Sequence, residues 1–156
     1  KCTTLQEVTL PDVVTDIGRY VFKSCCCITE MIPPKGLRKI GNVAFQECRM
    51  LEKVVLPDGI AEIVDSLFSG CYTLTEIVIP KSVTTVSRYC FENCQCMKRY
   101  YFLPDSPPEL TTTGTFLGLP KDCKFYVPKG RLDVYQTAES WSNYASYMVE
   151  MEGDVL

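Results

Sequence analysis

Cysteine is the residue type with the widest chemical scope in this chain, which contains ten cysteines and no histidine in its 156 residues. Thiols form disulfides, bind soft metal ions and act as nucleophiles. Nucleophilic arrangements that rely on an imidazole base are excluded, because no histidine is present to supply one. No glycine-rich phosphate loop occurs, and carboxylate pairs such as Asp12 and Asp16 fall where solvated charge is expected. We therefore predict that the chain is not an enzyme and binds no cofactor.

The spacing of the cysteines separates the remaining possibilities. Five of them recur at a constant interval, and four of these follow a phenylalanine by three residues. Such a recurring position is best explained as a small apolar slot in a core, which a free thiol fills well. Cys90 takes the position that Ala44 has in another unit, so we expect it to be buried as well. The recurring cysteines are Cys2, Cys25, Cys48, Cys71 and Cys94.

Two alternatives for the thiols stay open at this point. A disulfide could join cysteines outside the recurring position, since many cysteines in a surface protein ordinarily suggest bridges. Zinc is disfavoured, because a four-cysteine site usually takes two well-separated pairs, which segments 25–27 and 94–96 do not supply. We expect no metal site. The cysteines at variable positions are Cys26, Cys27, Cys96 and Cys123.

The constant interval extends beyond cysteine and defines a 23-residue repeating unit. Its first and fourth positions are large and apolar, its thirteenth is isoleucine or valine, and its eighteenth is phenylalanine. Self-similarity at a fixed period of this length indicates a stacked solenoid, in which each unit buries its apolar side against the next. The phenylalanines are Phe22, Phe45, Phe68 and Phe91.

The clearest copy, residues 51–73, shows how a unit is expected to fold. Leu51, Val54 and Leu56 are separated by residues that face solvent, which predicts a strand with one buried side. A proline follows, which ends the strand and turns the chain. The pair Ile60 and Ile63 predicts a short second strand on the opposite wall, and the last third of the unit predicts a turn. Successive units should stack about 4.8 Å apart.

The pattern changes after residue 103, and we predict two regions within one domain. Residues 1–103 are 23-residue repeats, the first truncated at its start, and residues 104–156 are a degenerate last repeat and a C-terminal cap. A loop rich in proline and threonine is expected from Pro104 to Pro120. Residues 125–128 repeat a strand ending, residues 130–138 have helical spacing, and Trp141 adds a large apolar surface. A solenoid needs such an atypical terminal unit to cover the end of its core. The predicted fold is therefore a β-rich repeat solenoid with an α+β cap.

Residues 37–48, Leu37-Arg-Lys-Ile-Gly-Asn-Val-Ala-Phe-Gln-Glu-Cys48, resemble the bacterial surface leucine-rich repeats of the BspA type almost letter for letter. Residues 126–144 are similar to the closing segment of such proteins. The resemblance implies a right-handed leucine-rich-repeat stack at the surface of gut or oral anaerobes or of some parasitic protists. For several members it also implies adhesion to host or bacterial proteins. The departures, Pro33, Leu67 and Cys90, concern packing.

The candidate binding site is the solvent-facing side of the predicted sheet. One outward position per strand forms a central row, and a charged row beside it is mostly acidic at one end and basic at the other. The central row can be explained by β-branched residues that brace neighbouring strands. It can also be explained as a protein-binding face, since soluble monomers seldom leave large apolar patches exposed. The central row is Thr9, Ile32, Val55, Val78 and Tyr101, with Phe102 as an alternative last member, and the charged row is Glu7, Glu30, Lys53, Glu76 and Arg99.

Composition narrows the class of partner. A net charge of −3 lacks the attraction that nucleic-acid binding needs, and no run of 18 apolar residues is present to enter a membrane. We predict a monomeric protein-binding or adhesion module, at the cell surface or secreted, whose ligand is a host or bacterial surface protein. Because residue 1 falls inside a repeat, any signal or anchor is expected upstream. The alternative is a structural spacer or accessory domain of a larger surface protein or enzyme.

Overall fold

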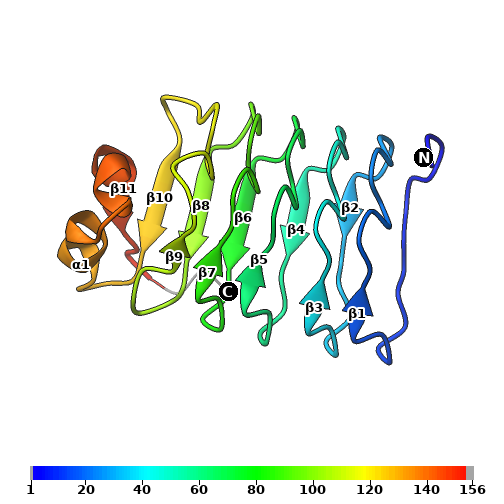
Figure 1. The fold of residues 1–156 in the computed structure, drawn as a ribbon, viewed down its shortest axis with the longest axis horizontal. Helices are drawn as coiled ribbons and strands as arrows, with labels where there is room; N and C mark the ends of the chain where they lie inside the picture. Colours follow the sequence, from blue (N-terminus) through cyan, green and yellow to red (C-terminus); the bar gives the residue numbers. More distant parts are fainter. Residues whose placement is uncertain (1, 154–156) are drawn as a thin grey trace.

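Each repeating unit forms one turn of a parallel β-solenoid in the computed structural model, which describes residues 2–153 (Figure 1). Residues 1 and 154–156, at the ends of the two predicted regions, lie outside the described residues. One wall of the solenoid contains β2 (Glu30–Met31), β4 (Lys53–Val55), β6 (Glu76–Ile79), β8 (Arg99–Phe102), β10 (Lys124–Val127) and β11 (Met148–Glu150). These strands form a six-stranded sheet in the order β11-β10-β8-β6-β4-β2, and every pair in it is parallel.

The register of this sheet follows the repeat. Val54 pairs with Ile77, and Ile77 pairs with Tyr100, in each case the residue at the same position of the next unit. Residues at one position of the unit therefore lie side by side. In β8, Tyr100 and Phe102 are buried, whereas the residue between them, Tyr101, is half-buried. The predicted inward and outward sides of the first strand are confirmed.

The opposite wall is built from the second apolar pair of each unit. Its strands are β1 (Asp16–Ile17), β3 (Lys39–Ile40), β5 (Glu62–Ile63), β7 (Thr85–Val86) and β9 (Glu109–Leu110). β1 pairs with β3, and β5, β7 and β9 form a separate sheet. In each strand the second residue is buried, as Ile63 is behind the exposed Glu62. The second strand predicted for each unit is confirmed.

The third side of the solenoid consists of turns, and their phenylalanines stack in one column inside the core. Successive ring centroids lie 5.3 to 5.8 Å apart, with the ring planes within 14° of parallel. Stacked aromatic pairs add roughly 0.5–1.5 kcal/mol each beyond the area they bury. The column contains Phe22, Phe45, Phe68, Phe91 and Phe116.

The recurring cysteines form a second column. The thiols of Cys48, Cys71 and Cys94 each donate a hydrogen bond to the carbonyl of the phenylalanine 26 residues earlier, with Sγ–O distances of 3.1 to 3.3 Å. Burial raises the pKa of Cys48 and of Cys94 to about 12, so both thiols remain protonated donors at neutral pH. The buried slot is confirmed for these three and for Cys25, and Cys90 is buried too. All ten cysteines are free thiols.

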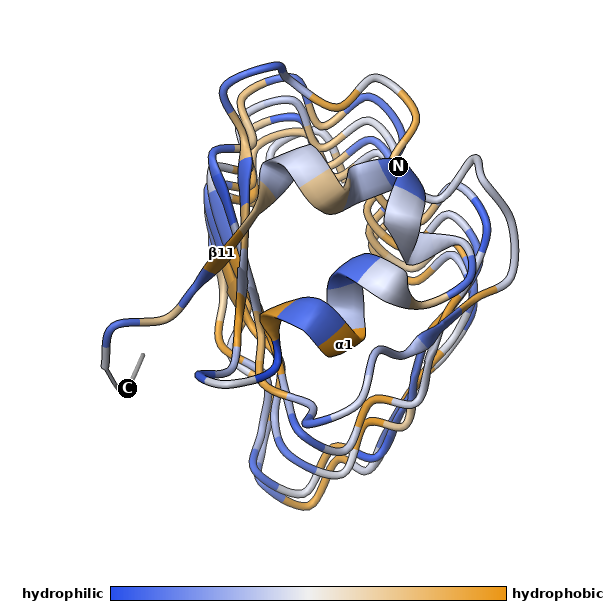
Figure 2. Cartoon of the chain, turned by 90° about the vertical axis from the view of Figure 1, so that its left-hand side faces the viewer, coloured by the Kyte–Doolittle hydropathy of each residue, from blue (hydrophilic) through white to orange (hydrophobic). Residues whose placement is uncertain are grey.

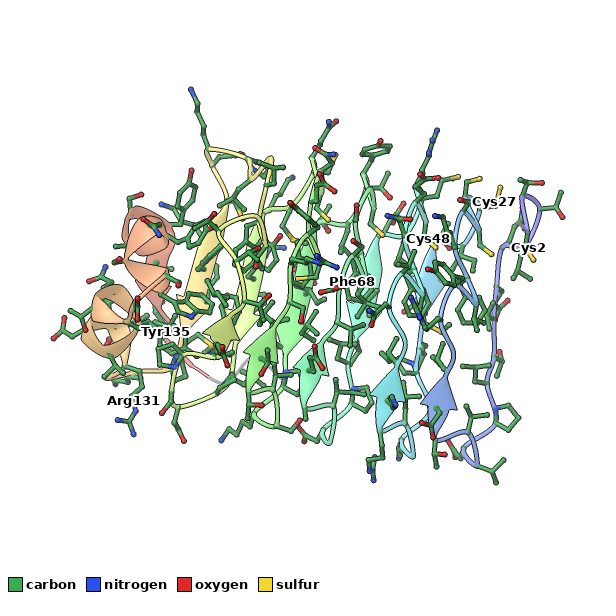
Figure 3. The ribbon with its side chains drawn as sticks, viewed as in Figure 1. Cys2, Cys27, Cys48, Phe68, Arg131 and Tyr135 are labelled. Atoms are coloured by element: carbon green, nitrogen blue, oxygen red, sulfur yellow. The ribbon has the colours of Figure 1, made fainter. Side chains whose placement is uncertain are left out.

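The prediction of burial is wrong for Cys2, which is exposed. A position in the column is buried by the turns stacked on both of its sides, and Cys2 belongs to the first described turn, at one end of the stack (Figure 3). The same end effect leaves Leu5 and Val8 partly buried, although their equivalents Ile28 and Met31 are fully buried.

In four successive turns, two corner residues lie in the left-handed backbone region. φ is 66° at Val43 and 60° at Glu47. This region costs a residue with a side chain roughly 1–2 kcal/mol, so neighbouring turns must hold these corners in place. The Val43 amide donates to the Asp65 carbonyl at 3.0 Å, and the Glu47 amide donates to the Ser69 carbonyl at 2.8 Å. The equivalent corner residues are Tyr20, Ser66 and Tyr89, and Ser24, Gly70 and Asn93.

The expected loop from Pro104 to Pro120 is wrong, because this segment completes another turn. Val86 of β7 pairs with Leu110 of β9, one position later than the repeat predicts. Phe116 stacks on Phe91, two positions later than the repeat predicts. One extra residue before β9 and one after it therefore remove this turn from the 23-residue pattern.

After β10 the chain folds over the end of the solenoid as a cap. Helix α1 (Leu132–Thr137) and the 3-10 helix η1 (Trp141–Tyr147) lie across this end (Figure 2). The buried Trp141 donates its indole N–H to the Pro108 carbonyl at 2.7 Å. The buried Tyr135 donates its hydroxyl to the Pro104 carbonyl at 2.8 Å. The predicted cap is confirmed. Within residues 2–153, no helix has the length and apolarity that crossing a bilayer requires.

Candidate functional site on the outer face of the six-stranded sheet

The predicted central row is present and in register. Val55 pairs with Val78, and Val78 pairs with Tyr101. At the other end, Thr9 forms a parallel bridge with Ile32. The last member of the row is settled, because Tyr101 faces outward while Phe102, the alternative, is fully buried.

The row continues into the cap, which sequence reasoning missed. Tyr126 of β10 pairs with Tyr101, and Val149 of β11 pairs with Tyr126. The alternation of Phe125, Tyr126 and Val127 could have signalled the first of these, because the two outer residues are buried and the middle one is not. The central row therefore has seven members: Thr9, Ile32, Val55, Val78, Tyr101, Tyr126 and Val149.

The central row is apolar, and parts of it remain open to solvent. Ile32 keeps 66% of its surface exposed and Val55 keeps 36%. Tyr101 and Tyr126 stack on each other, with ring centroids 4.9 Å apart and planes 23° from parallel. Burial raises the pKa of Tyr101, although Arg99 opposes the shift, so its hydroxyl stays neutral and can both donate and accept hydrogen bonds.

The charged row lies two residues before the central row on the same strands. Its members pair in the order Glu30, Lys53, Glu76 and Arg99, and Lys124 of β10 continues it next to Arg99. Arg99 donates from Nη2 to Glu76 Oε2 at 2.7 Å and from Nε to the same oxygen at 3.1 Å. This hydrogen bond raises the pKa of Arg99. The charges of Glu76 and Arg99 thus offset each other, and Lys124 makes the end of the row near the cap basic.

A third row, the outer row, lies two residues after the central row. It was not recognised in the sequence as part of the face, although its prolines were assigned to strand ends. Its accessible members line hollows beside the central row. A hollow of 470 Å³ is bounded by Ile32 and Val55 of the central row. A hollow of 630 Å³ is bounded by Tyr101, Tyr126 and Val149. The half-buried members of the outer row are Pro57, Leu103, Pro128 and Met151.

Two carboxylates outside the face, Glu62 and Asp65, are engaged in contacts between turns. Glu62 accepts a hydrogen bond from the Ser87 hydroxyl at 2.7 Å, and Asp65 pairs with Arg88 at 3.0 Å. In the part of the chain that the structure describes, no group of three acidic or cysteine side chains is placed to hold a metal ion. The face itself presents an apolar strip, two tyrosines and a charged border.

The family model described as the BspA type leucine rich repeat region matches residues 1–105, in six copies. The chain belongs to the BspA-type leucine-rich repeat family. Among curated proteins, none is similar enough to this BspA-type chain to count as a match.

Three solved structures share the fold of this BspA-type chain. A leucine-rich cell surface protein from Faecalibacterium prausnitzii is 24% identical, with a TM-score of 0.67, over 86% of this chain and 33% of its own. A leucine-rich repeat protein from Bacteroides ovatus is 26% identical, with a TM-score of 0.62, over 83% of this chain and 41% of its own. The leucine-rich repeat protein of T. pallidum is 23% identical, with a TM-score of 0.59, over 93% of this chain and 60% of its own. The chain thus spans only a part of the length of each. Its BspA-type relatives are repeat proteins, a non-catalytic kind of fold whose general use is protein interaction.

Proposed function

We propose that the chain is a non-enzymatic protein-binding or adhesion module, at the cell surface or secreted, that captures a protein ligand as a monomer. The observation that carries the proposal is the central row, in which seven side chains stand in register, mostly apolar and partly exposed, beside a charged row. Family membership supports it, as does the likeness to a cell surface protein. The proposed contact residues are Thr9, Ile32, Val55, Val78, Tyr101, Tyr126 and Val149, with Glu30, Lys53, Glu76 and Arg99 at the border.

Bracing between strands explains only part of the central row. Valine suits a pleated surface and packs against its cross-strand neighbours, so Val55 and Val78 alone would need no ligand. Ile32, however, is 66% exposed, and exposure of that size contributes little bracing. The stacked pair of Tyr101 and Tyr126 adds two polar tips on an apolar base, a combination enriched in binding surfaces.

The test is a fourfold variant that keeps the fold and changes the face: Ile32→Ser, Val55→Asp, Val78→Asp and Tyr101→Ser. The probes are immobilised fibrous extracellular-matrix proteins and mucus glycoproteins, and capture is measured on the 156-residue chain. Capture should fall at least tenfold while the far-UV circular dichroism spectrum is retained. The matched control is Val13→Asp, since Val13 is 85% exposed in a turn outside the sheet.

Two outcomes distinguish a binding face from a spacer role. Loss of capture in the fourfold variant but not in Val13→Asp supports the face as the binding site. Equal capture by the unaltered chain, the fourfold variant and Val13→Asp overturns the assignment of the binding site to this face. A structural spacer or accessory role within a larger surface protein would then take its place.

A further inference from the structure

The central and outer rows together form a strip that is long and narrow. The six strands from β2 to β11 are separated by five spacings of about 4.8 Å, so Ile32 and Val149 are about 24 Å apart along the strip. The two rows stand two residues apart on each strand, about 7 Å, because alternate side chains share one face. The outer row is interrupted at Pro34 and Pro80, which are buried. Charged residues follow one more residue along at several turns: Asp12, Lys35, Asp58 and Lys81.

These dimensions limit what can bind. A strip about 24 Å long and about 10 Å wide covers on the order of 250 Å² in outline, whereas each partner in a standard protein interface buries roughly 800 Å². A globular partner, or a second copy of this chain, would have to find most of its contact area outside the strip. One extended segment of a polypeptide fits the strip itself.

The way the strands are paired favours one extended conformation over another. Strands β4, β6, β8 and β10 are hydrogen-bonded on both sides, so a ligand lying across them can gain no place in the sheet and must satisfy its own backbone. A polyproline II segment does so, because it has no internal hydrogen bonds and its backbone is fully solvated. Its turn of three residues rises about 9.3 Å, which matches two strand spacings of about 9.6 Å. A β-strand ligand repeats every two residues, about 6.7 Å, and matches neither one spacing nor two.

The aromatic lining of the strip suits the same ligand. The rings of Tyr101 and Tyr126 stack on each other within it. A shallow hollow is lined by Val55, Val78 and Tyr101, and the 630 Å³ hollow is lined by Tyr101, Tyr126 and Val149. Aromatic-lined grooves are recurrent receptors of proline-rich segments.

Carboxylates lie at both ends of the strip. Glu150 and Glu152 line the hollow at the Val149 end. At the Ile32 end, Glu7, Asp12 and Glu30 line one hollow, and Lys35, Arg38 and Asp58 line a second. A basic residue that flanks the ligand segment can therefore meet a carboxylate at either end.

We propose that the ligand segment of this face is proline-rich and is bound across the strands in the polyproline II conformation. This inference rests on the proposed function of the sheet face as a protein-binding surface, and it specifies the class of segment that the face takes.

The test uses fluorescein-labelled synthetic peptides and the 156-residue chain, with binding followed by fluorescence polarisation. The first probe has eight prolines, roughly 25 Å long in the polyproline II form, between an arginine and a glutamate, and it is made in both directions. The second probe keeps the two charged ends and replaces the prolines by alternating glycine and serine. A proline probe in at least one direction should bind at least tenfold more tightly than the glycine-serine probe. Tyr101→Ala with Tyr126→Ala should weaken the binding of that proline probe at least tenfold. Val13→Asp should bind as the unaltered chain does.

The outcomes separate this inference from the one it rests on. Failure of both proline probes, while the fourfold face variant still loses capture of matrix proteins, overturns the proline-rich ligand and leaves the binding face standing. Binding of the proline probe that survives both tyrosine replacements also overturns it, because the peptide would then lie elsewhere. Retention of matrix capture by the fourfold variant overturns both.

Discussion

Six of the ten cysteines should resist alkylation in the folded chain. Cys25, Cys48, Cys71, Cys90, Cys94 and Cys123 are buried. Burial raises the pKa of Cys48 from an ordinary value near 9 to about 12. At pH 7.5 this lowers the fraction of reactive thiolate about 1,000-fold, since three pKa units separate the two values. Exclusion of the reagent from the core slows the reaction further.

The assay is pulsed labelling with iodoacetamide at pH 7.5, followed by mass mapping of each cysteine. Exposed Cys2 and Cys96 should be labelled within the pulse, and Cys48 and Cys94 should not until denaturant unfolds the chain. Guanidinium-unfolded protein without reductant serves as the control and should show all ten thiols labelled at similar rates. Rapid native labelling of Cys48 would refute the argument, and so would four or five disulfide bridges in the unfolded, unreduced sample.

Three further outcomes follow from the same stack. Ile63→Asp should abolish folding, because an unpaired buried charge costs several kcal/mol against a total free energy of unfolding of roughly 5–15 kcal/mol. Val55→Asp changes a residue on the outer face, so a denaturant titration should show a loss within about 1 kcal/mol. Deletion from Lys129 onward should produce aggregates in size-exclusion chromatography, because the apolar end of the stack and a strand edge become exposed, and a monomer with unchanged melting would contradict the cap. The free energy of unfolding should fall above pH 9. The thiols of Cys48 and Cys94 have a pKa near 9 in the unfolded chain and near 12 in the folded one, so each stabilises the fold fully below pH 9. Between these two values, each thiol's contribution to the free energy of unfolding declines by about 1.4 kcal/mol per pH unit. Replacing Cys48 and Cys94 with Ala should flatten that decline in thermal melts, and an equally steep decline would count against the linkage.

Much of the fold follows from the repeat because stacking forces equal positions into equal environments. Once Ile63 is assigned to the core, Ile40 and Val86 are expected there too, since they hold the same position in the neighbouring turns, and all three are buried. The same rule explains the failures. It fails at Cys2, in the first turn that the structure describes, and at Phe116, where two extra residues shift the phase while the ring still joins its column.

The corners of the turns and the use of the face were harder to predict. A left-handed residue is usually signalled by glycine, yet Val43 and Tyr89 occupy such corners, because neighbouring turns impose the backbone conformation. The row from Ile32 to Tyr101 was predicted by position, but the repeat demands outward residues there whether or not a ligand binds. A pattern that stacking alone requires carries no separate signal for function.

Trp141 is the only tryptophan of the chain. It lies in the cap and packs edge-on against Phe102, with the centroids of the two rings 4.9 Å apart. Its fluorescence therefore reports on one end of the stack, whereas circular dichroism averages over every turn. In a solenoid each turn touches only its neighbours, so loss of order that begins at the Cys2 end would lower the dichroism before it dims or shifts the tryptophan emission. Comparison of the dichroism with the tryptophan emission therefore shows which end of the stack unfolds first.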